Sequence, residues 1–313
     1  MGSRGCQAVR CKRQPGPQVI SDRAIERLRD AAAWPELDDR YTISGVAGRG
    51  GMGTVYVARD RVLDRDVAVK VLDLADQKGA RAARMRKEAH ILARLDHPGI
   101  VPVHDAGTLP DGRTFYVMKL VRGQRLDALT QQTSLAERLN VFGRVLDAVA
   151  FAHAQGVVHR DLKPENIMVG GFGEVYVMDW GVAQDHGSDG ERAVVGTPGY
   201  MPPEQEHAEG RVDARADIFA LGTMLIHLAG EDASPPLRAI AGKARRPDAS
   251  VRYADVESLA ADLARFRNHD PVDAYSEPIG DRVVRLYRRY ELPILLLLAY
   301  VVMRLILLLW RGI

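Results

Sequence analysis

The stretch GVVHRDLKPENIMV, residues Gly156–Val169, places a dense group of polar side chains between two apolar runs. A surface helix would spread such charges along one face, and a strand would alternate them with apolar residues. Pro164 stands within the polar group, where it rules out a continuing helix. The pattern therefore predicts a polar loop that is held at both ends by strands. Loops held by a rigid scaffold are where catalytic groups are commonly found.

The composition of the 313-residue chain is that of a folded protein, with 46% hydrophobic and 27% charged residues. A net charge of +2 is too balanced to favour nucleic acid, so no nucleic-acid partner is expected. Both cysteines, Cys6 and Cys11, lie near the N-terminus, which argues against a disulfide framework and a zinc site. No apolar segment follows the basic N-terminus, so no cleavable signal peptide is expected.

The pattern of residues changes from strand-like to helical along the chain. Residues 40–121 hold short β-type runs joined by turns, with one helical pattern between them at 80–96. Residues 122–270 are mainly helical, with two short β-type runs around the opening motif. A helix is also expected over Ser21–Trp34, within an N-terminal extension (1–39) that is expected to be partly disordered. The fold class predicted is α+β, with a β-rich part followed by a helical part.

The segment LPILLLLAYVVMRLILLLW, residues 292–310, carries a single charge, Arg304. As a helix its 19 residues measure roughly 28 Å, close to the thickness of a hydrocarbon core. The sequence therefore predicts one C-terminal transmembrane helix, preceded by a basic juxtamembrane segment at 271–291. The positive charge of this juxtamembrane segment predicts that the protein crosses the inner membrane once and keeps its main domain in the cytoplasm. The alternative is an apolar helix that caps the helical part of the fold.

The segment GRGGMGTV, Gly48–Val55, has the glycine spacing G-x-G-x-x-G. The spacing alone is a weak signal, because dinucleotide-binding loops share it. A dinucleotide site would be followed by a helix, whereas the residues after these glycines, TVYVARD, are typical of a strand. A glycine-rich hairpin leaves backbone N–H groups free to approach phosphates.

Lys70 lies in the strand-like segment VAVK and admits two interpretations. A strand lysine between valines commonly faces solvent. An inward-facing lysine instead needs a carboxylate partner, because an unpaired buried charge is costly. Glu88, in the helical pattern RMRKEAHIL, is the candidate partner, although it would serve equally well as an ordinary surface acid.

The segment MDWG, Met178–Gly181, ends a predicted strand on Asp179. Together with Asn166, Asp179 would supply the hard oxygen ligands that suit Mg²⁺. Taken by itself, Asp179 is more typical of a turn residue than of a metal ligand.

The order of these motifs is more specific than any one of them. Glycine loop, strand lysine, helix glutamate, H-R-D-x-K-x-x-N and D-W-G follow one another on the expected kinds of element. Over residues 40–270 the chain resembles a eukaryotic-like (Hanks-type) bacterial serine/threonine protein kinase, and its D-W-G wording is similar to planctomycete-like members. The resemblance implies a bilobal protein-kinase fold with an N-lobe (40–121) and a C-lobe (122–270). It also implies ATP, Mg²⁺ and Ser/Thr protein substrates.

The resemblance assigns roles to individual residues. Asp161 would accept the proton of the substrate hydroxyl, and Lys163 would steady the γ-phosphoryl charge. Lys70, held by Glu88, would grip the α- and β-phosphates, while the metal would be held by Asn166 and Asp179. The nucleotide would be bound by Ala47, Gly48, Arg49, Gly50, Gly51, Met52, Gly53, Thr54, Val55, Ala68, Lys70, Met118 and Met168.

Further residues would support the site. Thr197 resembles the threonine that contacts the catalytic aspartate and lysine, and Asp217 resembles the aspartate that braces the catalytic loop. Glu204 and Arg252 resemble the ion pair that closes the C-lobe. His159 would pack beneath Asp179.

Two departures from the family pattern affect the expected function. Ala47 stands where a larger aliphatic residue usually covers the adenine. Asp217 and Arg252 are only 35 residues apart, which shortens the substrate-side helical region of the C-lobe. An active, membrane-tethered kinase is expected because Lys70, Glu88, Asp161, Asn166 and Asp179 are all present. There are two alternatives: a pseudokinase that serves as an ATP-binding interaction scaffold, for which the shortened lobe is the argument, and a small-molecule kinase. Signals would reach the protein through partners, lipid or a possible homodimer.

Overall fold

A computed structural model describes residues 34–50, 53–72, 79–129, 133–185, 196–206, 212–231, 233–278, 280, 282 and 291–311. Two sequence predictions lie outside these residues. One is the helix over Ser21–Trp34, of which only Trp34 is described, and the other is the pair Gly51 and Met52 of the glycine loop. The basic juxtamembrane segment is described only in part.

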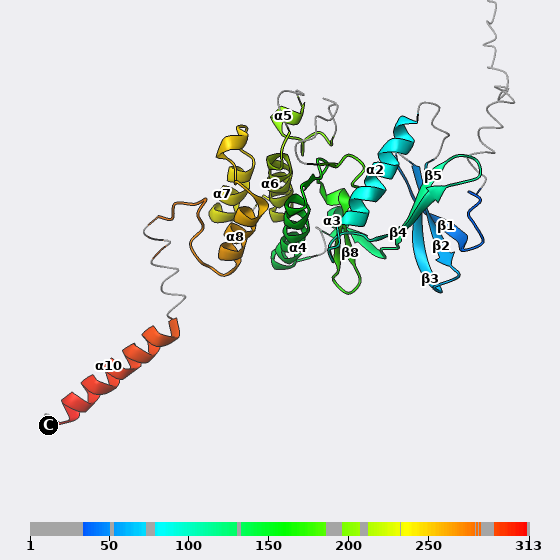
Figure 1. The fold of residues 1–313 in the computed structure, drawn as a ribbon. Coiled ribbons are helices and arrows are strands. Elements are labelled where there is room, and N and C mark those ends of the chain that lie inside the picture. The colour runs from blue at the N-terminus through cyan, green and yellow to red at the C-terminus, as the bar shows by residue number, and fades with distance from the viewer. Residues whose placement is uncertain are drawn as a thin grey trace, which may run out of the picture.

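The N-terminal lobe is built on a five-stranded antiparallel sheet in the order β1-β2-β3-β5-β4 (Figure 1). Helix α2 (Ala80–Arg94) packs against β4 and β5. In Figure 1 this helix lies between the sheet and the helical lobe. The strands are β1 (Tyr41–Gly50), β2 (Gly53–Asp60), β3 (Arg65–Val71), β4 (Val103–Thr108) and β5 (Thr114–Lys119).

Strand β3 separates two apolar cores, because successive side chains of a strand face opposite sides of the sheet. Val67, Val69 and Val71 join a small cluster on the outer face of the sheet. Ala68 joins the main core, which continues through α2 into the helical lobe. Lys70 shares this inner face with Ala68 by the same alternation, and it is buried.

The glycine-rich turn joins β1 to β2 as a hairpin, with Gly50 paired to Gly53 and Gly48 paired to Val55. Gly53 lies against the end of β3, where an added Cβ would stand 2.2 Å from the carbonyl oxygen of Val71. Only glycine fits such a close approach of two backbones. The hairpin predicted from the sequence is confirmed, and strand follows the glycines where a dinucleotide fold would place a helix.

The C-terminal lobe is organised around helix α4 (Leu135–Ala154), with α6 (Arg215–Ala229) and α8 (Val256–Arg267) packed on it. Ser134 begins α4 with a capping box: its hydroxyl accepts the Glu137 N–H at 3.3 Å, and the Glu137 carboxylate accepts the Ser134 N–H at 2.8 Å. The same lobe also holds several short elements: β6 (Gly123–Arg125), α3 (Leu126–Leu129), β7 (Val157–Val158), η1 (Pro164–Asn166), β8 (Ile167–Gly170), β9 (Val175–Val177), β10 (Gln184–Asp185) and α5 (Pro203–Glu206).

The shortened region holds a helix that the sequence patterns do not predict. Helix α7 (Pro235–Ala244) follows α6 after a brief loop and buries Leu237, Ile240, Ala241 and Ala244. It lies very close to α6, since a Cβ added at Gly222 would stand 2.6 Å from the Cβ of Ala244. From the end of α6 to the start of α8, the described part of the chain forms two helical elements, namely α7 and the short 3-10 turn η2 (Ala249–Val251). The helical lobe is therefore completed by a short segment of chain between α6 and α8.

The predicted C-terminal helix is present as α10 (Glu291–Arg311), which lies apart from both lobes in Figure 1. Its large apolar side chains from Leu295 to Leu307 are exposed rather than packed on the helical lobe. Lobe capping, the alternative considered for this segment, is therefore not observed. Among the described residues, no helix is both long enough and apolar enough to cross a membrane.

Candidate active site

A cavity of about 370 Å³ lies between the glycine hairpin and the loop that follows β9. The glycine hairpin covers it, Lys70 and Glu88 lie within it, and Asp179 stands at its edge on the loop after β9. Its lining residues are Gly48, Arg49, Gly50, Gly53, Val55, Lys70, Glu88, Leu92, Val101, Tyr116, Met118, Val177, Met178, Asp179 and Trp180.

Lys70 faces inward and is paired with Glu88, which resolves the two interpretations of this lysine. Its Nζ lies 2.8 and 3.0 Å from the two carboxylate oxygens of Glu88, and 3.5 Å from Oδ1 of Asp179. The hydroxyl of Tyr116 donates a further hydrogen bond of 3.0 Å to Glu88. Helix α2 thus contributes its one buried acid to the floor of the cavity.

The electrostatics of this group favour a charged lysine. Burial alone would lower the pKa of Lys70, but the charges of Glu88 and Asp179 outweigh it and hold that pKa above its ordinary value. Burial, together with the charge of Glu88, raises the pKa of Tyr116 well above its usual range. Lys70 therefore stays protonated and offers an ammonium group, of the kind that binds phosphate, inside the cavity.

The catalytic loop predicted from GVVHRDLKPENIMV forms a compact hydrogen-bonded group around Asp161. The Thr197 hydroxyl donates to Asp161 Oδ1 at 2.7 Å, and Lys163 Nζ lies 3.0 Å from Oδ2. Lys163 also donates to the Thr197 hydroxyl at 2.6 Å. Asn166 Nδ2 donates to the Asp161 carbonyl oxygen at 2.8 Å. Contacts to both carboxylate oxygens thus fix the orientation of the Asp161 side chain.

His159 holds the loop against the D-W-G segment. Its Nε2 lies 3.0 Å from the carbonyl oxygen of Met178, and its Nδ1 accepts the Asp161 N–H at 3.3 Å. Because a carbonyl only accepts and an N–H only donates, these contacts assign the proton of the neutral ring to Nε2. The ring packs against Trp180 with centroids 4.6 Å apart, and the Trp180 indole donates to Val177.

Asp217 braces the backbone of the same loop, as the resemblance implied. Its carboxylate accepts the N–H groups of His159 and Arg160, both at 2.8 Å, and lies 2.7 Å from Nε2 of His153. Arg160 has a positive φ of 69° and Asp179 one of 58°. Such conformations cost about 1–3 kcal/mol each, so they persist only where the surroundings enforce them.

The nucleotide residues predicted from the sequence divide into three groups. Six of them line the cavity: Gly48, Arg49, Gly50, Gly53, Val55 and Met118 join Lys70 there. Ala47, Thr54, Ala68 and Met168 do not line it; Ala47 is exposed, Ala68 pairs with Met118 across the sheet, and Met168 is half-buried. Gly51 and Met52 lie outside the described residues.

Tyr116 is the main site residue that the sequence analysis missed. Alternation along β5 carries the necessary signal, because Phe115 and Val117 pack with the outer cluster while Tyr116 and Met118 face the inner core. Nothing in the sequence, however, shows that a strand tyrosine and a helix glutamate meet.

Asn166 and Asp179, the predicted metal ligands, are brought close by a hydrogen bond of 2.8 Å from the Met178 N–H to the Asn166 carbonyl. The Asp179 side chain is 52% exposed. Over the described ranges, no group of three or more His, Cys, Asp or Glu side chains is placed to hold a metal. Asp179 lines the cavity, whereas Asn166 is buried and does not line it. Two oxygen donors of this kind fit Mg²⁺, which takes few protein ligands and completes its shell with phosphates and water.

Comparison with known proteins gives consistent matches. The family described as protein kinase domain matches residues 41–254. Serine/threonine-protein kinase PknB of Mycobacterium tuberculosis is 36% identical over 280 residues, covering 76% of this chain and 44% of that kinase. PknB of Mycobacterium leprae is 34% identical over 281 residues, covering 77% and 45%. A probable serine/threonine-protein kinase of Streptomyces coelicolor is 35% identical over 284 residues, covering 76% and 41%. The chain spans less than half the length of each of these relatives.

Proposed function

Because the chain belongs to the protein kinase domain family, we propose that it is an active serine/threonine protein kinase that transfers the γ-phosphoryl group of ATP to proteins. One observation carries the proposal. Asp161 is held by Lys163 and Thr197 while Lys70 is paired with Glu88, so both halves of a phosphoryl-transfer site are assembled. A pseudokinase would be expected to lack at least one of these contacts.

The transfer step follows from the placement of Asp161. The substrate hydroxyl oxygen forms a bond to the γ-phosphorus, and the bond from that phosphorus to the bridging oxygen of ADP breaks. Asp161 accepts the hydroxyl proton. Thr197 and Lys163 hold its two oxygens at 2.7 and 3.0 Å, so little reorganisation is needed during the reaction.

Lys70 supplies positive charge to the phosphates, and Glu88 keeps its ammonium group in place. Asn166 and Asp179 are the residues that would hold Mg²⁺, which when bound neutralises charge on the transferring phosphoryl group. The protein therefore acts mainly by positioning and by electrostatic stabilisation.

The experiment is incubation of the purified full-length protein with labelled ATP, Mg²⁺ and a mixture of protein substrates, followed by phosphosite mapping. Label on Ser and Thr of the substrates is expected. Nucleotide binding without transfer would instead support the scaffold alternative, and label on a small molecule alone would support the small-molecule kinase.

Membrane attachment is a separate proposal that rests on the sequence of residues 292–310. We propose that this segment anchors the protein in the inner membrane with the kinase domain in the cytoplasm. Its nineteen residues carry a single charge, and the exposed apolar side chains of α10 are left without cover by the lobes. Retention in membranes during an alkaline carbonate wash is expected. Release by that wash, or aggregation of a protein lacking residues 291–313, would rule the anchor out.

Two finer points complete the proposal. The D-W-G segment with Trp180 supports a place among planctomycete-like bacterial kinases; an even spread of D-W-G across other bacterial kinases would remove that support. We also propose that the protein self-associates as a homodimer.

A further inference from the structure

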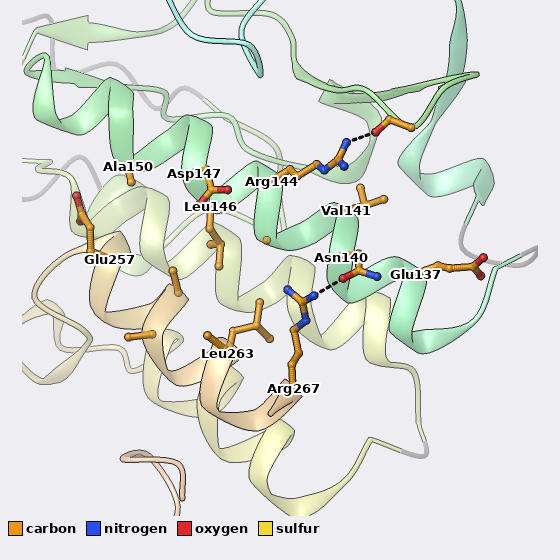
Figure 2. A pocket seen from close by; sticks show the side chains of 15 residues that line it. Glu137, Asn140, Val141, Arg144, Leu146, Asp147, Ala150, Glu257, Leu263 and Arg267 are labelled. Carbon is orange, nitrogen blue, oxygen red and sulfur yellow. Dashed lines mark hydrogen bonds between the residues drawn. The ribbon is translucent and has the colours of Figure 1, made fainter. Parts of the chain in front are cut away.

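A second hollow lies in the C-terminal lobe, between helices α4 and α8, with a volume of about 930 Å³ (Figure 2). It shares no lining residue with the nucleotide cavity. Its floor is apolar and made largely of small residues, namely Gly143 and Ala150 from α4 with Ala260, Ala261 and Ala264 from α8. Small side chains on both helices leave room for a bulky group to enter.

Charged residues border this groove at both of its ends, and an acid, Glu137, lies beside Asn140, where its carboxylate accepts the N–H and the hydroxyl of Ser134. Figure 2 shows Glu257 toward the Ala150 end and Arg267 toward the Asn140 end. Arg267 donates to the side-chain oxygen of Asn140, which is neutral. In the part of the chain that the structure describes, neither Glu257 nor Arg267 forms an ion pair.

A second pair of charges lies between these ends. Asp147 and Arg144 are exposed on successive turns of α4, and Arg144 donates to the carbonyl oxygen of Gly173. Within the described ranges neither residue of this pair forms an ion pair, although the charge of Asp147 acts on His97. Glu257 and Arg267 therefore place opposite charges toward opposite ends of the groove, and among the described residues neither of the two is held in an ion pair.

A protruding aromatic side chain stands next to the groove. Phe172 is 98% exposed at the tip of the turn between β8 and β9, beside Gly173, which lines the groove. The turn is tightly held: Gly170 donates to Glu174 at 2.7 Å, Gly173 donates to Gly170 at 3.0 Å, and the Phe172 N–H donates to the Glu174 carboxylate at 3.1 Å. Because the backbone of the turn is already held, only the two side-chain torsions of Phe172 would lose freedom when its ring binds.

We propose that this face is the interface of a homodimer, in which Phe172 of each protomer enters the small-residue groove of the other. A two-fold axis makes one patch contact itself, so an isologous interface needs knob and hollow on the same face. It also needs charges that match after rotation, and the two-fold places Glu257 of one protomer over Arg267 of its partner. The α4–α8 face meets both requirements. The inference gives a surface to the self-association proposed above.

The test measures the oligomeric state of the full-length protein in detergent, by light scattering after size-exclusion chromatography across a concentration series. The wild type is expected to be a dimer, and Phe172→Ala is expected to weaken dimerisation by at least about tenfold. Glu257→Arg and Arg267→Glu should each be monomeric when alone. Mixed together, they should form a heterodimer, because both charge pairs are then matched. Arg238→Glu, an exposed position on α7, is the matched control and should dimerise normally.

A wild type that is monomeric throughout would overturn the proposal. So would a dimer that ignores both charge reversals and Phe172→Ala, because its interface would lie elsewhere. Loss of a different co-purifying protein in the variants, without any self-association, would assign the groove to that partner instead. ATP binding, thermal unfolding and phosphoryl transfer of each variant are measured in the same samples. An inactive dimer would count against the kinase activity alone, and an active monomer against this interface alone.

Discussion

Lys70 is only 9% exposed, and its position illustrates how single residues make the site. A buried charge costs several kcal/mol of desolvation unless partners compensate it, and here two carboxylates do so. Glu88 in turn receives hydrogen bonds from both Lys70 and Tyr116. Each member of this group therefore depends on the others. Replacing one of them should lower kcat/KM for ATP, and the decrease should be larger when the replacement leaves a charge unpaired.

Replacement of Glu88 and of Tyr116 should have unequal effects. Tyr116→Phe removes one hydrogen bond, worth about 1 kcal/mol, and should lower kcat/KM for ATP by about fivefold. Glu88→Gln removes the charged partner of Lys70, worth about 3 kcal/mol, and should lower kcat/KM by roughly a hundredfold. Steady-state kinetics with varied ATP make the comparison. Equal effects of the two substitutions would contradict the proposed arrangement.

Asp217 gives a second residue-level prediction, this time on pH. Burial opposes the charged form of Asp217, but hydrogen bonds from His153 and the His159 N–H outweigh it, so its pKa lies below the ordinary value. A carboxyl whose pKa is lowered in the folded state stabilises the fold at pH values above its unfolded pKa of about 4. That contribution is lost as pH falls through the lowered, folded-state pKa.

Asp217→Asn should therefore lower the free energy of unfolding by about 2 kcal/mol at pH 7. The difference between the variant and the wild type should shrink as pH is lowered below about 4. Urea unfolding at a series of pH values measures it. A gap that stays constant down to pH 3 would show that the charge of Asp217 does not stabilise the loop.

At the scale of elements, Arg252 joins the segment after α7 to α5 and α6. Its guanidinium forms two bonds with Glu204, at 2.7 and 2.8 Å, and donates to three backbone carbonyls. The side chain is fully buried and stacks over Phe219 at 5.1 Å. The ion pair implied by the family resemblance is confirmed, and it closes the shortened lobe.

Arg252→Lys keeps the charge but loses the planar fork of donors. Buried carbonyls would be left unpaired, and we expect a loss of about 2–4 kcal/mol in the free energy of unfolding. Arg238→Lys on the exposed side of α7 serves as the control and should change little. Chemical denaturation of both variants tests the point, and a lysine variant as stable as the wild type would refute it.

The sequence predicted some elements well and others not at all. The motif residues could be identified because their order and spacing are visible in the sequence. Strand alternation around Lys70 showed that this residue faces one side of the sheet, but only tertiary packing determines whether that side is buried. Helix α7 was missed because Pro235 and Pro236 mark a break in a sequence pattern, although proline is well tolerated in the first turn of a helix. Asp262 was missed too: it is fully buried and accepts bonds from Tyr253, Arg265 and the N–H groups of Asp273 and Ala274. Contacts of this kind depend on tertiary packing.

At the scale of the whole molecule, the two lobes contribute different parts of one site. The sheet and α2 hold Lys70 and Glu88, whereas the helical lobe holds Asp161, Asn166 and the loop of Asp179. Lys70 lies 3.5 Å from Asp179, so the lobes are close enough for both to contact a single nucleotide. The division into two lobes was predictable from the change of residue pattern, but the distance between their functional groups was not.

The most direct test of the kinase assignment compares the wild type with Asp161→Asn in the full-length protein. The rate of phosphoryl transfer and the Kd for ATP are measured in the same preparations. In the proposed step Asp161 meets the acceptor hydroxyl, and it does not line the nucleotide cavity, so the variant should bind ATP normally. Its transfer rate should fall by about 10²–10⁴-fold, the contribution of a positioned proton acceptor. Transfer that continues unchanged in Asp161→Asn would contradict the account.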